Sequence, residues 1–227
     1  VKKFYQMLRS EDEQNTDLVI HGDIASYKWE DSDVGSYDLA QELSSIKTPK
    51  LTVRINSYGG EVSQGLGIYN LLKSFKGEVI TINDGFACSA ASYIFLAGSK
   101  RIMPKSSLLM IHNAWTVAHG DANELRKTAE LLEKVTLPSI EIYKQSSNLT
   151  ENEIKKMLDE ETWISADEAL AYGFATQVTE DEPKQSLENH FLYKLVMKNK
   201  ELEKQVPKES NQEVKDPWAS FFKPLKG

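Results

Sequence analysis

Three features of the sequence have the residue types and spacing that acyl transfer requires. The pair Gly59-Gly60 lies between an apolar run and a helical pattern, so its backbone N–H groups could bind an anion or a developing oxyanion. Ser89 lies at the expected start of an apolar helix, where the helix dipole favours negative charge. His112 lies at the end of an expected strand. Because a serine hydroxyl needs a neighbouring base to take its proton, Ser89 and His112 together would form a nucleophile and its base.

Each feature by itself has an ordinary structural explanation. A Gly-Gly pair is usually a turn, a serine at a helix start is usually an N-cap, and a histidine at a strand end is often only packed there. The expected path of the chain favours the catalytic explanation. A helix of about 10 residues from Ser89 returns roughly 15 Å across the sheet, a turn over residues 100–105 reverses the chain, and a strand of about six residues climbs back about 20 Å. His112 is thereby carried beside Ser89.

A serine–histidine pair usually has an acid that holds the imidazole in one tautomer. The sequence offers Asp159, Glu160 and Glu161, just before a helix that Ser165 would cap. Charge runs are usually solvated, and the residues alone do not choose among the three. The four histidines are scattered without ligand spacing, so we expect no metal site and no organic cofactor.

The elements that must position these residues alternate between strand and helix patterns. Short apolar runs rich in β-branched residues predict buried strands over residues 18–22, 51–56, 79–83 and 107–112. Helical patterns occupy residues 35–46, 62–75, 90–97 and 121–145, and capping-box spacing follows Thr150 and Ser165, with Gly173 as a helix stop. The alternation predicts an α/β fold with a parallel sheet, whose loops bring the candidate residues to one edge.

Composition divides the chain into four parts. Residues 1–16 form an N-terminal segment, and residues 17–180 hold every candidate catalytic residue. Residues 181–206 are charged with apolar residues at near-helical spacing, which predicts a helical extension that either docks on a partner or is simply solvated. Residues 207–227 contain three prolines and an aromatic cluster, which is typical of a flexible tail.

Length and composition exclude several classes of protein. The chain has 227 residues and a formal net charge of −7, which disfavours nucleic acid as a partner. Its single cysteine, Cys88, can form neither an internal disulfide nor a cysteine metal cluster, as expected in a reducing cytoplasm. The longest strongly apolar run, residues 90–97, is far shorter than the roughly 20 residues that span a bilayer, and residues 1–14 lack an apolar signal core. We therefore expect a cytoplasmic protein without a membrane partner.

With these residues in view, the sequence from residue 17 to residue 178 resembles the ClpP family, the proteolytic subunits of the Clp protease. Residues 56–60, NSYGG, are similar to that family's Asn-Ser-Pro-Gly-Gly loop, with Tyr58 where proline is usual. Residues 85–98, GFACSAASYIFLAG, are similar to its nucleophile segment, and residues 110–112 to its Met-Ile-His. The segment TWISADEA, followed by YG, is similar to the stretch after its catalytic acid.

The resemblance implies a ClpP/crotonase-like fold and a serine endopeptidase. Ser89 would be the nucleophile and His112 the general base and then acid, while the amides of Gly59 or Gly60 with Ala90 would form the oxyanion hole. The register places Glu161 where the family has aspartate, and Asp159 or Glu160 could substitute. The resemblance further implies stacked heptameric rings that helix 121–145 interlocks, with unfolded or flexible polypeptides as substrates.

Other features resemble one branch of the family. The run Glu161-Thr162-Trp163, the charged extension and the aromatic tail look more like peptidases encoded by phages and prophages, which are associated with head maturation; phage capsid or scaffold proteins would then be partners. The sequence shows no clear counterpart of the N-terminal loop that engages an ATP-driven AAA+ unfoldase, which makes such a partner the weaker candidate.

Three other functions remain open. A crotonase-like acyl-CoA enzyme would use the Gly-Gly amides to polarise a thioester, but it gives the Ser89/His112 pair no role. A catalytically silent ring protein would act as a scaffold through its tail. A membrane-bound signal peptide peptidase would resemble a Ser/Lys design with an anchor, which the sequence does not favour.

Overall fold

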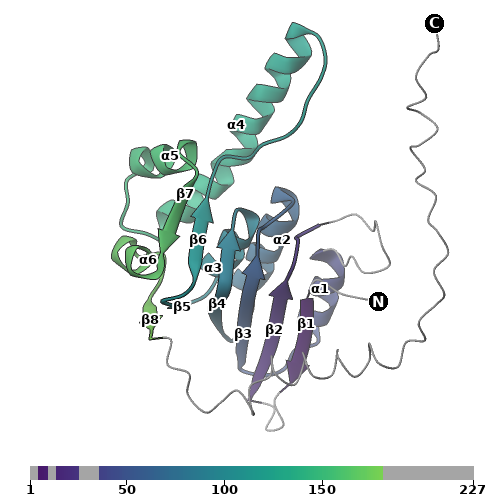
Figure 1. Cartoon of the computed structure of the whole chain (residues 1–227). Coiled ribbons are helices and arrows are strands. Elements are labelled where there is room, and N and C mark those ends of the chain that lie inside the picture. Colours follow the sequence, from purple (N-terminus) through teal and green to yellow (C-terminus); the bar gives the residue numbers. More distant parts are fainter. Residues whose placement is uncertain (1–4, 10–13, 26–35, 181–227) are drawn as a thin grey trace, which may run out of the picture. The chain divides into compact units, whose positions relative to one another are not determined.

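The computed structural model describes residues 5–9, 14–25 and 36–180, and its core is a sheet with helices against it (Figure 1). The strands are β1 (Tyr5–Arg9), β2 (Asn15–His21), β3 (Lys50–Ser57), β4 (Glu78–Cys88), β5 (Lys100–Pro104), β6 (Leu108–Ile111), β7 (Thr162–Ser165) and β8 (Gln177–Thr179). The helices are α1 (Ser36–Ser44), α2 (Val62–Lys73), α3 (Ala90–Leu96), α4 (Ala122–Gln145), α5 (Glu151–Asp159) and α6 (Ala166–Tyr172). The predicted helical extension over residues 181–206 and the predicted tail over residues 207–227 lie outside the described residues.

The sheet is mainly parallel, and its long strand β4 pairs with two different strands along its length. Strands β2, β3 and β4 are parallel neighbours, while β1 pairs antiparallel with β2. The first half of β4 pairs with β5 through Ile80–Ile82, and its last residues pair with β6 through Phe86–Cys88. Strand β7 then pairs antiparallel with β6. The predicted α/β fold with a parallel sheet and flanking helices is confirmed.

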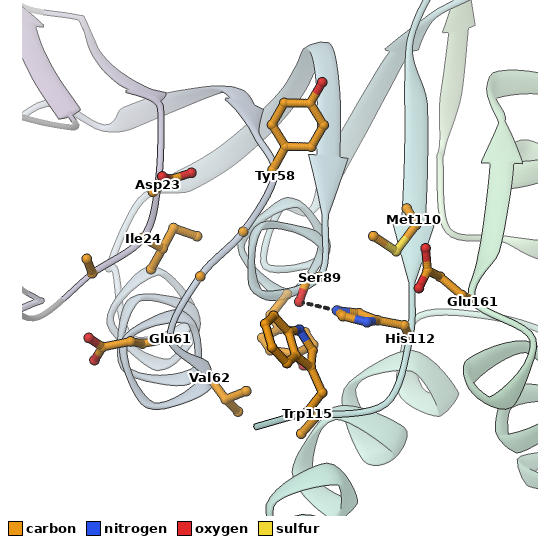
Figure 2. Close-up of a pocket in the computed structure, with 15 residues that line it drawn as sticks. Asp23, Ile24, Tyr58, Glu61, Val62, Ser89, Met110, His112, Trp115 and Glu161 are labelled. Carbon is orange, nitrogen blue, oxygen red and sulfur yellow. Dashed lines mark hydrogen bonds between the residues drawn. The ribbon is translucent and has the colours of Figure 1, made fainter. Parts of the chain in front are cut away.

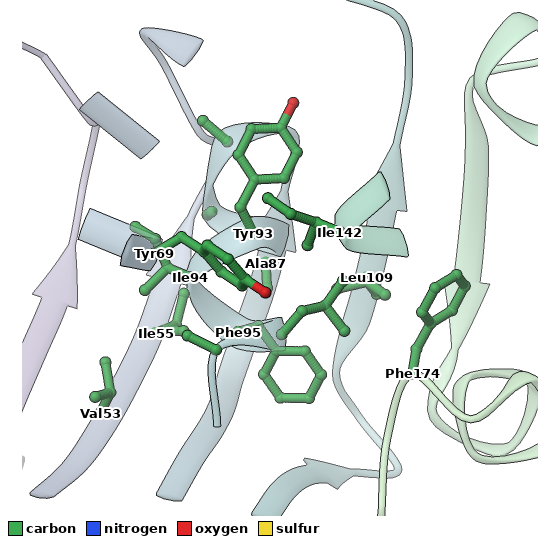
Figure 3. Close-up of a cluster of buried hydrophobic side chains, with 14 of the residues drawn as sticks. Val53, Ile55, Tyr69, Ala87, Tyr93, Ile94, Phe95, Leu109, Ile142 and Phe174 are labelled. Carbon is green, nitrogen blue, oxygen red and sulfur yellow. The ribbon is translucent and has the colours of Figure 1, made fainter. Parts of the chain in front are cut away.

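The core lies between the sheet and helices α1 to α3, and it extends to buried residues of α4, α5 and α6. In β3 the residues Leu51, Val53 and Ile55 are fully buried, whereas the alternate residues are partly exposed, as expected when helices cover one face of a sheet. Every residue of α3 is buried, which explains why its sequence is apolar all round rather than along one stripe. Phe95 of α3 packs in this cluster (Figure 3). The nucleophile candidate thus precedes a helix that has little freedom to move.

Only the C-terminal part of helix α4 packs against the core. Asp121 forms a capping box with Glu124, which confirms the predicted start of this helix. Its buried residues all lie between Thr136 and Tyr143, and the side chains from Asp121 to Val135 include none that is buried. Figure 1 shows the N-terminal half of α4 projecting beyond the sheet. Among the described residues, no helix combines the length and apolar composition needed to span a bilayer.

The prediction of a turn over residues 100–105 is wrong. Residues Lys100–Pro104 form β5, because their backbone groups pair with Ile80–Ile82 on one side and with β8 on the other. The charged Arg101 is accommodated because its guanidinium donates to the carbonyl groups of Gly98, Gly173 and Phe174. The helix expected to have about 10 residues after Ser89 is also shorter, since α3 has seven.

The helix signals near the carboxyl end of the domain are confirmed. The Thr150 and Ser165 side chains each accept the N–H of the residue three positions later, and the glutamate there bonds back to the cap. Gly173 ends α6 with a φ of 86°, in the left-handed region that glycine adopts without a steric penalty. These caps fix the start of α5, which precedes the acidic run Asp159 to Glu161, and both ends of α6, which follows it.

Candidate active site

Ser89 occupies a strained turn between β4 and α3. Its φ of 51° and ψ of −124° are rare for a residue with a side chain, and such conformations cost about 1–3 kcal/mol. The turn is held on both sides: the Ser89 N–H donates to the Met110 carbonyl at 2.9 Å, and its carbonyl accepts from the Ser92 N–H at 2.9 Å. The Ser89 side chain makes no helix-capping hydrogen bond, so the N-cap explanation does not apply.

The Ser89 hydroxyl instead forms a hydrogen bond with His112. Ser89 Oγ and His112 Nε2 lie 2.7 Å apart, as drawn in Figure 2. The two residues come together because β4 and β6 are neighbouring strands in which Cys88 pairs with Met110. Ser89 directly follows Cys88, and His112 lies two residues after Met110. A hydrogen bond of this length allows direct transfer of the serine proton to the imidazole.

The electrostatics of His112 favour its neutral form. Burial lowers the pKa of His112 below its ordinary value, and the charge of Glu161 opposes this shift without reversing it. Near neutral pH the imidazole is therefore uncharged, and in the tautomer that carries its proton on Nδ1 the Nε2 lone pair can accept the Ser89 proton. Once it does so, the nearby Glu161 carboxylate stabilises the imidazolium.

The three candidate acids have different surroundings. Asp159 accepts a hydrogen bond of 2.8 Å from the Asn113 side chain, and Glu160 lies 3.8 Å from Lys156 with 61% of its side chain exposed. Glu161 alone of the three lines the cavity that contains Ser89 and His112. Figure 2 draws it on the side of the imidazole away from Ser89, although no hydrogen bond joins Glu161 to His112 in the described part of the chain.

The two glycines of the NSYGG loop pack directly against the Ser89 turn. Gly59 and Gly60 have φ values of 99° and 148°, which favour glycine. A Cβ on Gly59 would lie 2.6 Å from the Cys88 carbonyl oxygen and 2.8 Å from Ser89 Cβ, and one on Gly60 would lie 2.0 Å from the Ile24 carbonyl oxygen. No larger side chain fits at either position without moving backbone.

The backbone N–H groups of this loop are not equivalent. The Gly59 N–H donates to Ser57 Oγ at 3.0 Å, and that hydroxyl donates to the Gly22 carbonyl at 2.5 Å. Within residues 14–25 and 36–180, the N–H groups of Gly60 and Ala90 have no hydrogen-bond acceptor. Gly60 and Ala90 therefore have the two amides that could bind an oxyanion. The role of Ser57 could not be recognised from sequence, although it lies within the NSYGG motif.

The cavity around these groups has a volume of about 900 Å³ and is mostly apolar. Apart from the residues already described, its larger lining side chains are Ile24, Tyr58, Val62, Tyr93, Met110 and Trp115. Apart from its two tyrosines, its ionisable lining consists of carboxylates and His112, without lysine or arginine among the described residues. An apolar cavity with a few converging polar groups is typical of a substrate-binding site.

Cys88 and clusters of metal-ligating side chains do not offer a second reactive centre in the described residues. Cys88 is buried, and burial raises the pKa of its thiol to about 11, so it lacks the thiolate that a nucleophile requires. Across residues 5–9, 14–25 and 36–180, no group of three or more His, Cys, Asp or Glu side chains could hold a metal ion. Ser89 and His112 are the groups in this cavity arranged for nucleophilic chemistry.

Comparison with known proteins gives consistent matches. The family model described as Clp protease matches residues 38–182. The ATP-dependent Clp protease proteolytic subunit of Oltmannsiellopsis viridis is 34% identical over 134 residues, 58% of this chain and 69% of that protein. Proteolytic subunit 2 of Treponema denticola is 31% identical over 146 residues, 63% of this chain and 72% of that protein. The solved structure of a ClpP1 mutant from Listeria monocytogenes has a TM-score of 0.61 at 25% identity, covering 75% of this chain and 94% of that one.

Proposed function

This chain belongs to the Clp protease family and is a serine-type peptidase, and we propose that it hydrolyses peptide bonds through an acyl-enzyme on Ser89. The observation that carries this proposal is the 2.7 Å contact between Ser89 Oγ and His112 Nε2, beside two backbone N–H groups without an acceptor in the described residues. Neither a crotonase-like acyl-CoA reaction nor a silent scaffold gives this contact a role.

In the proposed reaction, His112 Nε2 takes the Ser89 proton as Oγ attacks the carbonyl carbon of the scissile peptide bond. The carbonyl oxygen becomes an oxyanion that the N–H groups of Gly60 and Ala90 bind. His112 then gives its proton to the leaving amine, and the C–N bond breaks to leave an ester on Ser89. A water molecule that loses its proton to His112 attacks this ester, and the acid product leaves as the proton returns to Ser89.

Glu161 is the proposed acid of this site. Its support is its place in the cavity and the effect of its charge on the pKa of His112. It would act mainly by stabilising the imidazolium that forms during each step. Because Asp159 and Glu160 already have other partners, they are weaker candidates for the same role.

We propose that the protein assembles into stacked heptameric rings through α4. The projecting half of this helix exposes Leu125 and Leu131, whose exposed fractions are 43% and 58%, and Leu137 at its base is 57% exposed. A second copy of the chain would cover these large apolar side chains. Rings that enclose the cavities would restrict substrates to unfolded or flexible polypeptides.

We further propose that residues 17–180 are the peptidase domain and that the protein acts in the cytoplasm. We also propose that its natural substrates are phage scaffold or capsid proteins that are cut during head maturation. The extension of residues 181–206 and the tail of residues 207–227 would recruit them. The similar proteins are named ATP-dependent. For this chain an AAA+ unfoldase remains the weaker proposal, and cleavage of a flexible protein substrate without ATP or a partner would rule against a requirement for one.

Labelling with a fluorophosphonate tests the proposed chemistry without knowledge of the natural substrate. The purified chain should form an adduct that mass spectrometry maps to Ser89, and the adduct should be lost in Ser89→Ala and strongly reduced in His112→Ala. Cleavage of a small fluorogenic peptide should fall in the same two variants. A folded, oligomeric sample that forms no adduct and cleaves no peptide would contradict the proposal.

A further inference from the structure

The carbonyl group of Ser89 is held by a buried chain of hydroxyl groups. Besides the Ser92 N–H, it accepts a hydrogen bond of 2.6 Å from Ser92 Oγ. Ser92 Oγ also lies 2.7 Å from the phenolic oxygen of Tyr143, in helix α4. Ser92 and Tyr143 are both fully buried, so water does not compete for these contacts. The chain links helix α4 to the strained turn that presents the proposed nucleophile.

The direction of each hydrogen bond follows from the number of protons available. A carbonyl oxygen can only accept, so the single hydroxyl proton of Ser92 goes to Ser89. Ser92 Oγ can then engage Tyr143 only as an acceptor, so we infer that the phenol of Tyr143 donates to it. Burial raises the pKa of Tyr143 well above its ordinary value, which keeps the phenol protonated as this role requires.

Peptide geometry connects this chain of hydroxyls to the oxyanion hole. The Ser89 carbonyl and the Ala90 N–H belong to one planar trans peptide unit, so they point in opposite directions. Two hydrogen bonds that hold the carbonyl towards Ser92 therefore fix the direction of the Ala90 N–H. The nitrogen of Ala90 lies 3.0 Å from the position of a Cβ on Gly59, which places it against the loop that supplies the second amide.

The far end of the hydroxyl chain is rigid. The ring of Tyr143 packs against Tyr93, with centroids 5.8 Å apart, and edge-on against Phe174, with centroids 6.0 Å apart. It thus lies between α3, its own helix α4 and the segment after α6. A phenol fixed by three elements gives Ser92 one favoured hydroxyl orientation, whereas a serine without this partner could rotate its hydroxyl away from Ser89.

We propose that Ser92 and Tyr143 are positioning residues, which orient the Ser89–Ala90 peptide so that the Ala90 N–H faces the oxyanion of the substrate. The inference rests on the proposed peptidase function. Neither residue touches the substrate. Both act through the peptide plane, and Tyr143 makes the docking of α4 part of what shapes the site.

The test compares Ser92→Ala and Tyr143→Phe with wild-type protein, each as the full chain. After the active sites are counted by fluorophosphonate titration, we expect kcat for a small peptide to fall about tenfold in Ser92→Ala and severalfold in Tyr143→Phe, with KM unchanged. Complete loss of an oxyanion donor costs about 10²–10³ in kcat, and misorientation should cost less. The double variant should be no slower than Ser92→Ala, because both changes break one chain of hydrogen bonds.

A peptide boronate separates positioning from a general structural defect. This inhibitor forms a tetrahedral adduct that uses the oxyanion hole, so its affinity should fall in proportion to kcat. The matched control is Tyr69→Phe, which removes another buried phenol of the core without touching Ser89 or the cavity and should leave both values unchanged. Thermal unfolding and sedimentation establish that each variant is folded and assembled.

The possible results distinguish this inference from the function on which it rests. If Ser92→Ala and Tyr143→Phe keep wild-type kcat and boronate affinity per active site, the positioning role is overturned while the peptidase function stands. The positioning role is also overturned if boronate affinity stays constant and only the number of active sites falls. If wild-type protein is not labelled at Ser89, the proposed function itself fails.

Discussion

The N–H of Gly59 donates to the hydroxyl of Ser57, 3.0 Å away, and is thereby engaged before any substrate arrives. The same hydroxyl donates to the Gly22 carbonyl at 2.5 Å, so Ser57 ties the glycine loop to the end of β2. The resemblance to the ClpP family left Gly59 and Gly60 as alternatives for the oxyanion hole. This contact favours Gly60, whose N–H has no acceptor within the described residues.

Substitution of Gly60 should therefore strongly impair catalysis. In Gly60→Ala the new Cβ would lie 2.0 Å from the Ile24 carbonyl oxygen, so the backbone must shift and the amide must move. We expect kcat for a small peptide to fall about 10²-fold or more, which is the typical effect of removing one oxyanion donor. Steady-state kinetics normalised by active-site titration would measure it.

Gly67→Ala is the matched control for this substitution. A Cβ at this position in α2 would meet only Ser36, at 3.5 Å, so we expect wild-type kcat and a stability gain of about 0.5–1 kcal/mol in thermal or denaturant unfolding. Wild-type kcat in Gly60→Ala would refute the assignment of this amide.

Glu161 should be the only member of the acidic run that catalysis needs. Glu161→Gln keeps the shape of the side chain and removes the charge that favours the imidazolium of His112. Loss of a hydrogen-bonded triad aspartate costs about 10⁴ in kcat. Because no hydrogen bond joins Glu161 to His112 in the described residues, we expect a smaller loss of about 10-fold to 10²-fold in kcat/KM.

Asp159→Asn and Glu160→Gln are the isosteric controls for Glu161→Gln. Their carboxylates face Asn113 and Lys156, so each variant should stay within about twofold of wild-type kcat/KM. A larger loss in Asp159→Asn than in Glu161→Gln would move the acid of the site to Asp159.

The pH profile should report the pKa of His112. Because burial lowers this pKa below the ordinary 6.5 and the base must be neutral, kcat/KM should rise with pH through a pKa below 6.5 and be constant near neutrality. Glu161 favours the protonated form and raises this pKa, so Glu161→Gln should move the rise to lower pH. Peptidase assays between about pH 4 and pH 8 at constant ionic strength would locate it.

Two results would contradict the expected pH profile. A midpoint above 6.5 in the wild-type protein would mean that burial does not dominate the pKa of His112. A rise that moves to higher pH in Glu161→Gln would mean that the carboxylate does not interact with His112 in the expected sense.

The projecting half of α4 should be required for assembly and dispensable for folding. In Leu125→Glu/Leu131→Glu, two exposed leucines become charged, which should disfavour an apolar interface between copies. We expect smaller assemblies in sedimentation at micromolar concentration, with the free energy of unfolding of the subunit changed by about 0.5 kcal/mol or less, as is usual for surface positions.

Lys127→Glu serves as the control for assembly, since it adds negative charge at an exposed polar position of the same helix. It should leave the oligomer intact. Wild-type protein that sediments as a monomer at micromolar concentration would contradict the ring proposal directly.

Some of the structure follows from short stretches of sequence. The apolar runs of β2, β3 and β4 and the capping boxes at Thr150 and Ser165 were predictable, because they depend on residues only a few positions apart. Strand β5 was not, because Lys100–Pro104 begins with two charged residues and acquires its strand conformation by pairing with Ile80–Ile82. The carbonyl groups that satisfy Arg101 come from positions as distant as Phe174.

The sequence by itself determined the α/β class, the helix caps and the candidate pair Ser89 and His112, since periodicity, capping and motif spacing depend on residues close together in the chain. Only the tertiary structure decided that Glu161 shares the cavity with this pair, that the Gly59 amide is engaged by Ser57, and that Ser92 bonds Tyr143 across 51 positions. Which partner a carboxylate, amide or hydroxyl finds depends on groups that folding brings together, and local sequence preference does not specify them.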